Sequence, residues 1–129
     1  MTTLVVDTHA ILWFLENDNR LSRTAARSLD EADHILLPSI CLVEITYLVE
    51  KGRLQAAVLP RLLAELDRAD TTLSLASLDL GIVRALQHVS RTQVPDMPDR
   101  IIAATAFFYN VPLVTRDDRI RSSGIEALW

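Results

Sequence analysis

The chain has 129 residues, half of them hydrophobic, which predicts a single domain over residues 1–129 with a substantial core and excludes a disordered chain. Its formal net charge of −4 argues against a protein that binds nucleic acid through a basic face alone, although all but one of its 13 cationic residues are arginines, which suit phosphate contacts. The single cysteine, Cys41, excludes an internal disulfide, and no apolar run is long enough for a membrane span, so we expect a cytoplasmic protein that does not enter a membrane.

Short apolar runs rich in β-branched residues predict the strands. The clearest are TLVV at 3–6, HILLP at 34–38 and VPLVT at 111–115. Continuous apolar runs of this length are typical of strands that are buried on both faces of a parallel sheet. TTLSLASL at 71–78 is a weaker candidate, and IEALW at 125–129 is consistent with a terminal edge strand.

Helical patterns separate these runs. They cover residues 8–17, 21–32, 39–52, 55–69, 78–90 and 97–110. Ser22, Ser39 and Asp79 are candidate N-caps, and Pro60 indicates a kink or a late helix start. Strands that alternate with helices predict an α/β fold, in which a central, mainly parallel sheet is covered by helices on both faces.

Four acidic residues that are distant in sequence fall on one edge of this predicted sheet. In such a fold the carboxyl ends of strands and the amino ends of helices share an edge, and ligands bind along it. Asp7 ends the first strand, and Glu44 lies just over one turn into the helix after the second. Asp99 lies in the first turn of the last long helix, and Asp117 closely follows the strand at 111–115. We therefore predict that these four carboxylates meet at one site.

Most of these acids also have a purely structural interpretation. Asp7 could cap the helix after the first strand, and Asp117 or Asp118 could cap a short helix of their own. Asp96 and Asp99 have the spacing of a capping pair, in which Asp96 caps the helix and Asp99 reaches back. The sequence alone leaves both interpretations open for these residues.

Glu44 is harder to explain structurally. Its neighbours Leu42, Val43 and Ile45 are apolar, and a charge among apolar residues usually needs a partner or a metal. The alternative is that Glu44 faces solvent on a narrow polar stripe with Lys51 one or two turns further on. The joint pattern of four acids favours a site over four separate structural roles.

The chemistry of the acids predicts a hard metal ion. No pair of histidines or cysteines lies nearby to suggest zinc, and oxygen ligands favour Mg²⁺ or Mn²⁺. One or two such ions would stop the carboxylates repelling one another and would attract a phosphate. A metal-bound water loses its proton readily and can attack a phosphodiester. Thr8, Ser39 and Thr115 could position water, or could merely cap helices and end strands.

The segments that carry these residues resemble a known family. LVVDTHAILWFL, LPSICLVEI, MPDRIIAATA and PLVTRDDRI occur in the order and approximate spacing of the PIN-domain ribonucleases, and the chain particularly resembles the VapC toxins of bacterial toxin–antitoxin pairs. The resemblance extends from Leu4 to about Ile125. It implies a PIN-like three-layer α/β/α sandwich and an acidic quartet that binds Mg²⁺ or Mn²⁺, made of Asp7, Glu44, Asp99 and Asp117.

The resemblance also implies an activity and partners. It implies a cytoplasmic endoribonuclease that acts on RNA, forms a homodimer and is inhibited by a small VapB-like antitoxin. Arg100, Arg116 and Arg119 are candidate contacts to phosphate or to the antitoxin, the alternative being solvated charge on a helix face. The bulky residues of AILWFL and AFFYN could supply part of a dimer face, although we expect most of Trp13, Phe107, Phe108 and Tyr109 in the core.

One position departs from the family pattern. Val94 stands where many relatives have a histidine before the last helix, whereas Asp99 and Arg100 are kept. The role of that histidine is therefore absent here or supplied elsewhere. His9 and His88 are the candidates, and we expect both to be structural or surface residues.

Two other functions compete with this interpretation. A receiver-like signalling domain has a similar length and an Mg²⁺-binding acidic edge, but it needs a second acid after the first strand, a strand-end aspartate near mid-chain and a late lysine. This chain has one acid in VVDTH, no such aspartate in EKGRLQAAV, and Lys51 as its only lysine. A PIN-type nuclease that acts on DNA, or in RNA processing without an antitoxin, is the other alternative.

Overall fold

The computed structural model describes all residues from Met1 to Trp129, and a five-stranded sheet forms its centre. The strands are β1 (Thr3–Val6), β2 (His34–Pro38), β3 (Leu73–Ala76), β4 (Leu113–Val114) and β5 (Ala127–Leu128). They lie in the order β3-β2-β1-β4-β5, and every neighbouring pair is parallel. The expected sheet is confirmed, and it is wholly rather than mainly parallel.

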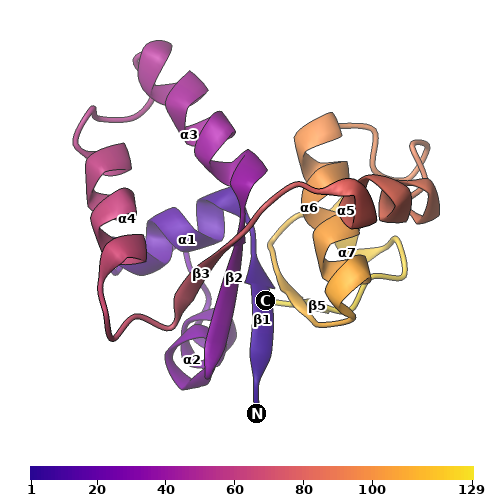
Figure 1. Ribbon diagram of the computed structural model, residues 1–129, viewed down its shortest axis with the longest axis horizontal. Coiled ribbons are helices and arrows are strands. Elements are labelled where there is room, and N and C mark those ends of the chain that lie inside the picture. The colour runs from indigo at the N-terminus through magenta and orange to yellow at the C-terminus, as the bar shows by residue number, and fades with distance from the viewer.

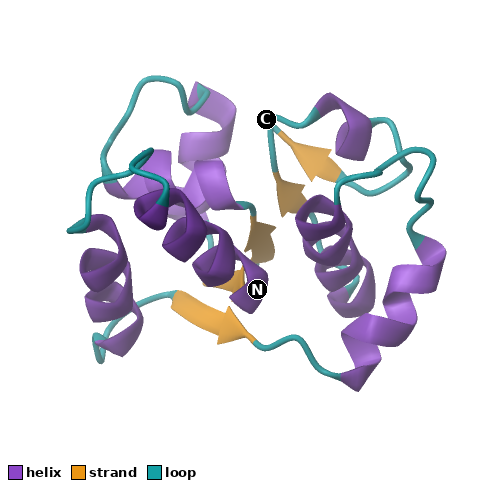
Figure 2. Ribbon diagram, turned by 90° about the horizontal axis from the view of Figure 1, so that it is seen from above, coloured by secondary structure: helices purple, strands orange, loops and turns teal.

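Helices cover both faces of this sheet, which gives the expected three layers. The helices are α1 (Thr8–Leu15), α2 (Arg23–Glu31), α3 (Ser39–Glu50), α4 (Val58–Asp67), α5 (Leu80–Ala85), α6 (Met97–Tyr109) and α7 (Asp118–Arg121), and a 3₁₀ turn, η1 (Leu86–His88), follows α5. The helices α1 to α4 lie on one side of the sheet and α5 and α6 on the other (Figures 1 and 2). The carboxyl ends of the strands therefore face the amino ends of helices from both outer layers.

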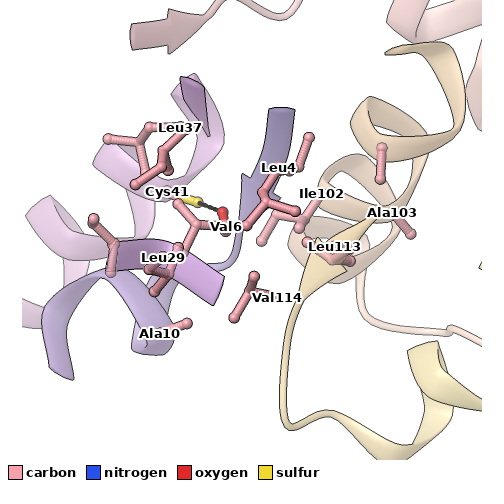
Figure 3. Close-up of a cluster of buried hydrophobic side chains, with 14 of the residues drawn as sticks. Leu4, Val6, Ala10, Leu29, Leu37, Cys41, Ile102, Ala103, Leu113 and Val114 are labelled. Carbon is pink, nitrogen blue, oxygen red and sulfur yellow. Dashed lines mark hydrogen bonds between the residues drawn. The ribbon is translucent and has the colours of Figure 1, made fainter. Parts of the chain in front are cut away.

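The core explains why the central strands are uninterrupted apolar runs. Val5, Leu37 and Leu113 lie on three different strands and are fully buried. Figure 3 shows side chains from both helical layers packed around β1, with the Cys41 sulfur 3.9 Å from the Val6 carbonyl oxygen. Each Å² of apolar surface that is buried contributes about 25 cal/mol to the free energy of folding, so this packing is the main source of stability. It holds the end of β1, and with it Asp7, in a fixed position.

Polar side chains fix where several helices begin. The Ser22 hydroxyl accepts a hydrogen bond from the Ala25 amide at 3.0 Å, as predicted from the sequence. The Asp79 carboxylate caps α5 in the same way. Such caps typically contribute about 1 kcal/mol each.

Three expectations need correction. Ser39 does not cap α3, because the helix starts directly after Pro38 and the Ser39 hydroxyl instead accepts from the Leu78 amide at 3.0 Å. The helix expected at 78–90 is α5 alone, followed by the 3₁₀ turn. Phe107, Phe108 and Tyr109 are not core residues, since between 39% and 46% of each is exposed.

Two further details concern helix starts and lengths. Helix α4 begins at Val58, so Pro60 lies in its first turn, where proline is tolerated, and the late start rather than the kink is confirmed. Trp13 is buried, in agreement with the expected core position. No helix has the length and apolar character needed to cross a membrane.

Candidate active site

A cavity of about 770 Å³ opens at the carboxyl edge of the sheet, and all four predicted acids line it. Asp7 comes from the end of β1, Glu44 from α3, Asp99 from the first turn of α6 and Asp117 from the segment between β4 and α7. The parallel sheet thus brings together residues that lie up to 110 positions apart, as the sequence predicts.

Backbone groups of the neighbouring strand β4 and of helix α1 hold Asp7 in place. Its amide donates to the Val114 carbonyl of β4 at 3.2 Å, and its Oδ1 accepts from the Ala10 amide at 2.8 Å to cap α1. Burial raises the pKa of Asp7, although the Thr115 hydroxyl and the Ala10 amide oppose that shift. The capping role and the place on the cavity therefore coexist in one residue.

Glu44 does not lie on a solvated stripe beside Lys51. Its Oε1 accepts a hydrogen bond of 2.6 Å from the hydroxyl of Thr8, which is itself buried in the first turn of α1. Burial raises the pKa of Glu44, the Thr8 hydrogen bond lowers it, and the negative charges of Asp96 and Asp7 raise it further. The sequence therefore places a carboxylate in a partly buried position and supplies a single neutral donor for it.

The carboxyl group of Asp99 has a strongly raised pKa. Burial, followed by the charges of Asp96, Asp117 and Glu44, raises its pKa to about 7. Its position is set by Asp96, whose Oδ2 accepts from the Asp99 amide at 3.1 Å and caps α6. The predicted cap is confirmed, and Asp96 also lines the cavity.

Asp117 also combines a cap with a place on the cavity. Its Oδ1 accepts from the amides of Arg119 and Ile120 at 2.9 and 3.1 Å, which starts the short helix α7. The buried Thr115 hydroxyl accepts from the Asp117 amide at 3.0 Å and fixes the loop. Both of these bonds use Oδ1 of Asp117, and a side-chain hydrogen bond between Asp117 and Asp99 contributes to the raised pKa of Asp99.

The donor set of the cavity suits a hard divalent cation. The four acids and Thr8 offer carboxylate and hydroxyl oxygens, and these are the ligands that Mg²⁺ and Mn²⁺ prefer. After burial, repulsion by neighbouring carboxylates raises the pKa of Asp99, and a cation would remove that repulsion. The side chains are not gathered into a finished cage, since no three His, Cys, Asp or Glu residues are close enough together to hold an ion. The chemistry fits a metal, and closure around one would need movement of the side chains.

The remaining predicted residues divide into two groups. Thr8, Asp96, Arg116 and Arg119 line the cavity, and Thr115 supports it from behind. Ser39, Arg100 and Asp118 do not line it.

Arg100 has a structural role. Its guanidinium donates to the Val89 carbonyl at 3.1 and 3.3 Å and to the Leu86 carbonyl at 3.2 Å, so it ties α6 to the turn after α5. Asp118 is a solvent-exposed residue 3.7 Å from Arg121. Neither interaction leads toward the acids.

The structure also places residues on the cavity that the sequence did not single out as site residues. These are His9, Trp13, Arg20, Val94, Pro95, Ile102 and Trp129. His9 was expected to be a structural or surface residue. It is exposed, but it lies at the cavity, four residues before Trp13 on the same face of α1. The spacing of four residues between His9 and Trp13 could have predicted that they lie together. The contact of Trp129 with Trp13 could not be predicted in this way, because it depends on the pairing of β4 with β5.

Comparison with known proteins identifies the fold and the sequence family. Residues 4–124 match the PIN domain family. The chain belongs to the PIN-domain family. This PIN domain is also 30% identical to Ribonuclease VapC22 of Mycobacterium tuberculosis over 127 residues, which cover 95% of this chain and 92% of that protein. The resemblance to VapC inferred from the four motifs is thereby confirmed.

Solved structures share this architecture over nearly the whole chain. VapBC2 from Rickettsia felis, bound to a DNA fragment from its promoter, gives a TM-score of 0.71 at 18% identity, over 98% of this chain and 97% of that one. A toxin–antitoxin complex from Klebsiella pneumoniae gives 0.68 at 17% identity, over 96% of this chain and 94% of that one. At such identities the similarity establishes the three-layer PIN fold.

Proposed function

We propose that this PIN domain is the toxin of a toxin–antitoxin pair and acts as a metal-dependent endoribonuclease. The observation that carries the proposal is the convergence of Asp7, Glu44, Asp99 and Asp117 on one cavity at the carboxyl edge of the sheet. The similarity to Ribonuclease VapC22 supports RNA as the substrate.

The four carboxylates would hold one or two Mg²⁺ or Mn²⁺ ions. A bound ion of this kind makes water more acidic and compensates charge on a phosphate. The chain contributes the positions of the ligands. The caps of α1 and α7 fix Asp7 and Asp117 through one oxygen each, and Thr8 fixes Glu44 through one oxygen. The raised pKa of Asp99 keeps its carboxyl partly protonated near neutral pH when no cation is bound.

Two of the arginines that line the cavity support an anionic substrate. The arginines Arg116 and Arg119 line the cavity, and neither side chain makes an ion pair or a hydrogen bond within the chain. Guanidinium groups bind phosphate oxygens through parallel N–H donors. A single strand or loop of RNA suits the site better than a duplex, because its bases are free to turn out of the helix.

The second partner in the proposal is a small VapB-like antitoxin protein. Two of the structures with the same fold are described as VapBC2 and as a toxin–antitoxin complex, which supports a protein inhibitor for this chain too. We place this regulation in the cytoplasm, where substrate and inhibitor would compete for one toxin.

We also propose that the chain forms a homodimer through apolar residues of α5 and α6. Leu80 and Val83 of α5 are 62% and 50% exposed, and Phe107 and Phe108 at the end of α6 are 45% and 46% exposed. The Phe108 ring packs directly over Gly81, so these exposed side chains lie on adjoining helices. Exposed apolar residues grouped in this way are typical of protein interfaces. Sedimentation of Phe108→Asp and of wild type tests the dimer.

The ribonuclease proposal is tested by incubating the purified protein with total RNA. We expect cleavage with Mg²⁺ or Mn²⁺, none with EDTA, and none by Asp7→Asn with the metal present. Asparagine can still cap α1, so this variant should fold normally. Equal cleavage with metal and with EDTA would contradict the metal mechanism, and full activity of Asp7→Asn would exclude Asp7 as a ligand.

A further inference from the structure

We propose that the cavity contains a subsite for a single nucleotide next to the acids, made of an aromatic cluster, His9, Trp13 and Trp129, and of Arg116. The base would stack on the accessible rings, and Arg116 would bind the adjoining phosphate. This inference rests on the proposed nuclease function and specifies how the site holds a single strand. All four residues line the same cavity as the four carboxylates.

Trp13 is the centre of the cluster. The His9 ring lies 5.6 Å from it, tilted by 46°, and the Trp129 ring lies 6.0 Å from it in an edge-to-face arrangement. Trp13 itself is only 6% exposed, so it is a support rather than a contact surface. His9 is exposed and Trp129 is partly exposed, and these two rings carry the surface that a ligand can reach.

Two arginines lie against the same indole. The guanidinium carbon of Arg116 is 4.9 Å from the centre of the Trp13 ring, and that of Arg20 is 5.0 Å from it. Arg20 is engaged by Asp18, whose carboxylate accepts from it at 2.7 and 3.1 Å. Arg116 has no carboxylate partner, so the indole holds a cation whose N–H donors stay free.

These features together fit a nucleotide better than a peptide. A cation with free N–H donors can bind a phosphate. Partly exposed aromatic rings can stack with a base, and such stacking tolerates any base sequence. An arginine-bearing segment of a protein partner would be repelled by Arg116 and would find its attraction at the carboxylates instead. An apolar peptide would leave the Arg116 charge without a partner.

The test measures binding of a labelled single-stranded RNA of about ten nucleotides to Asp99→Asn, a parent that should not cleave it, in Mg²⁺. Adding Trp129→Ala should weaken binding about five- to a hundredfold, and Trp129→Phe should restore it. Adding Arg116→Ala should weaken binding and reduce the slope of log affinity against log salt by about 0.7, whereas Trp129→Ala should leave that slope unchanged.

Tyr109→Ala and Arg121→Ala are the matched controls, since neither residue lines the cavity. If Trp129→Ala does not fold, the subsite can be tested by measuring RNA binding of His9→Ala and the salt dependence of RNA binding of Arg116→Ala. Binding that is equal in these variants and the controls would overturn the subsite, as would absence of RNA binding in the parent. Loss of antitoxin binding alone would assign the cluster to a protein partner and overturn it too.

The nuclease function is tested separately by RNA cleavage with the wild type. If the wild type does not cleave RNA but the parent binds it with the expected dependence on Trp129 and Arg116, the proposed activity fails and the subsite stands. If the wild type cleaves RNA and the variants bind like the controls, the activity stands and the subsite fails.

Discussion

The hydroxyl of Thr8 donates a 2.6 Å hydrogen bond to Oε1 of Glu44, and this bond joins α1 to α3 through two residues that are 36 positions apart in sequence. Thr8 directly follows Asp7, so one turn of α1 controls two of the four carboxylates at the cavity. Glu44 receives no backbone hydrogen bond, which makes the Thr8 hydroxyl the group that orients it and favours its ionised form.

Replacing Thr8 by valine should shift the acid side of the pH–activity profile upward. Loss of the hydroxyl removes the interaction that lowers the pKa of Glu44, so ionisation of Glu44 requires a higher pH. By analogy with other groups that orient ligands, we expect about a tenfold or greater loss of activity at neutral pH. Initial rates of RNA cleavage across pH measure this. Thr8→Ser keeps the hydroxyl and should behave like wild type, and an unshifted profile in Thr8→Val would refute the role.

The metal-free protein should lose stability as the pH rises from about 4 to about 7. The folded-state pKa of Asp99 is raised to about 7, so the folded state binds the proton more tightly than the unfolded state does. Its contribution is fully present below the unfolded pKa and is lost as the pH passes through the folded pKa. In EDTA, the melting temperature of Asp99→Asn should increase relative to that of the wild type as the pH rises toward 8. A difference in melting temperature that stays the same at all pH values would contradict this. Added Mg²⁺ should stabilise only the wild type.

Asp96→Asn separates the cap of α6 from the charge beside Asp99. Asparagine caps helices as well as aspartate does, so the stability should change little. The charge of Asp96 is the second-largest cause of the raised pKa of Asp99, after burial, so that pKa should fall. NMR titration of the Asp99 carboxyl measures the shift, and Asp96→Ala, which loses the cap as well, should cost about 1 kcal/mol of stability. An unchanged Asp99 titration would show that the two charges do not interact.

Arg100→Ala should impair stability rather than cleavage. The change leaves the carbonyl group of Val89 without its donor, at a cost of about 1–3 kcal/mol, whereas the Leu86 carbonyl keeps the hydrogen bond from the Val89 amide. Urea unfolding measures this, with the exposed Arg84→Ala on α5 as control, and cleavage per folded molecule should not change. Normal stability with reduced RNA or antitoxin binding would instead restore the ligand contact that the sequence predicted for Arg100.

The sequence predicted those parts of the fold that depend on local pattern. Strands β1 and β2 have the expected limits because their apolar runs end abruptly at Asp7 and Ser39. The four acids met as expected, because a parallel sheet brings strand ends to one edge whatever their separation in sequence. Helix α5 ends earlier than predicted. The carbonyl groups that follow it accept hydrogen bonds from Arg100, which belongs to another helix, α6. No local pattern in residues 78–90 reports that contact.

The aromatic cluster was beyond sequence reasoning for a similar reason. Trp13 was rightly expected in the core, but its contact with Trp129 depends on β5 pairing beside β4, and β4 is only two residues long. The exposure of Phe107 and Phe108 depends on the tertiary packing of α6 against α5, which leaves the end of α6 open to solvent. The sequence thus indicated which residues are apolar but not which of them stay exposed.

Asp7 and Asp117 each cap the first turn of a helix with one carboxylate oxygen. A relative without the proposed nuclease activity would still need a capping side chain at both positions, such as aspartate, asparagine or serine, because α1 and α7 use it in their first turns. Glu44 and Asp99 cap nothing. Their loss in a homologue would therefore indicate a protein that has kept the fold but not the proposed reaction.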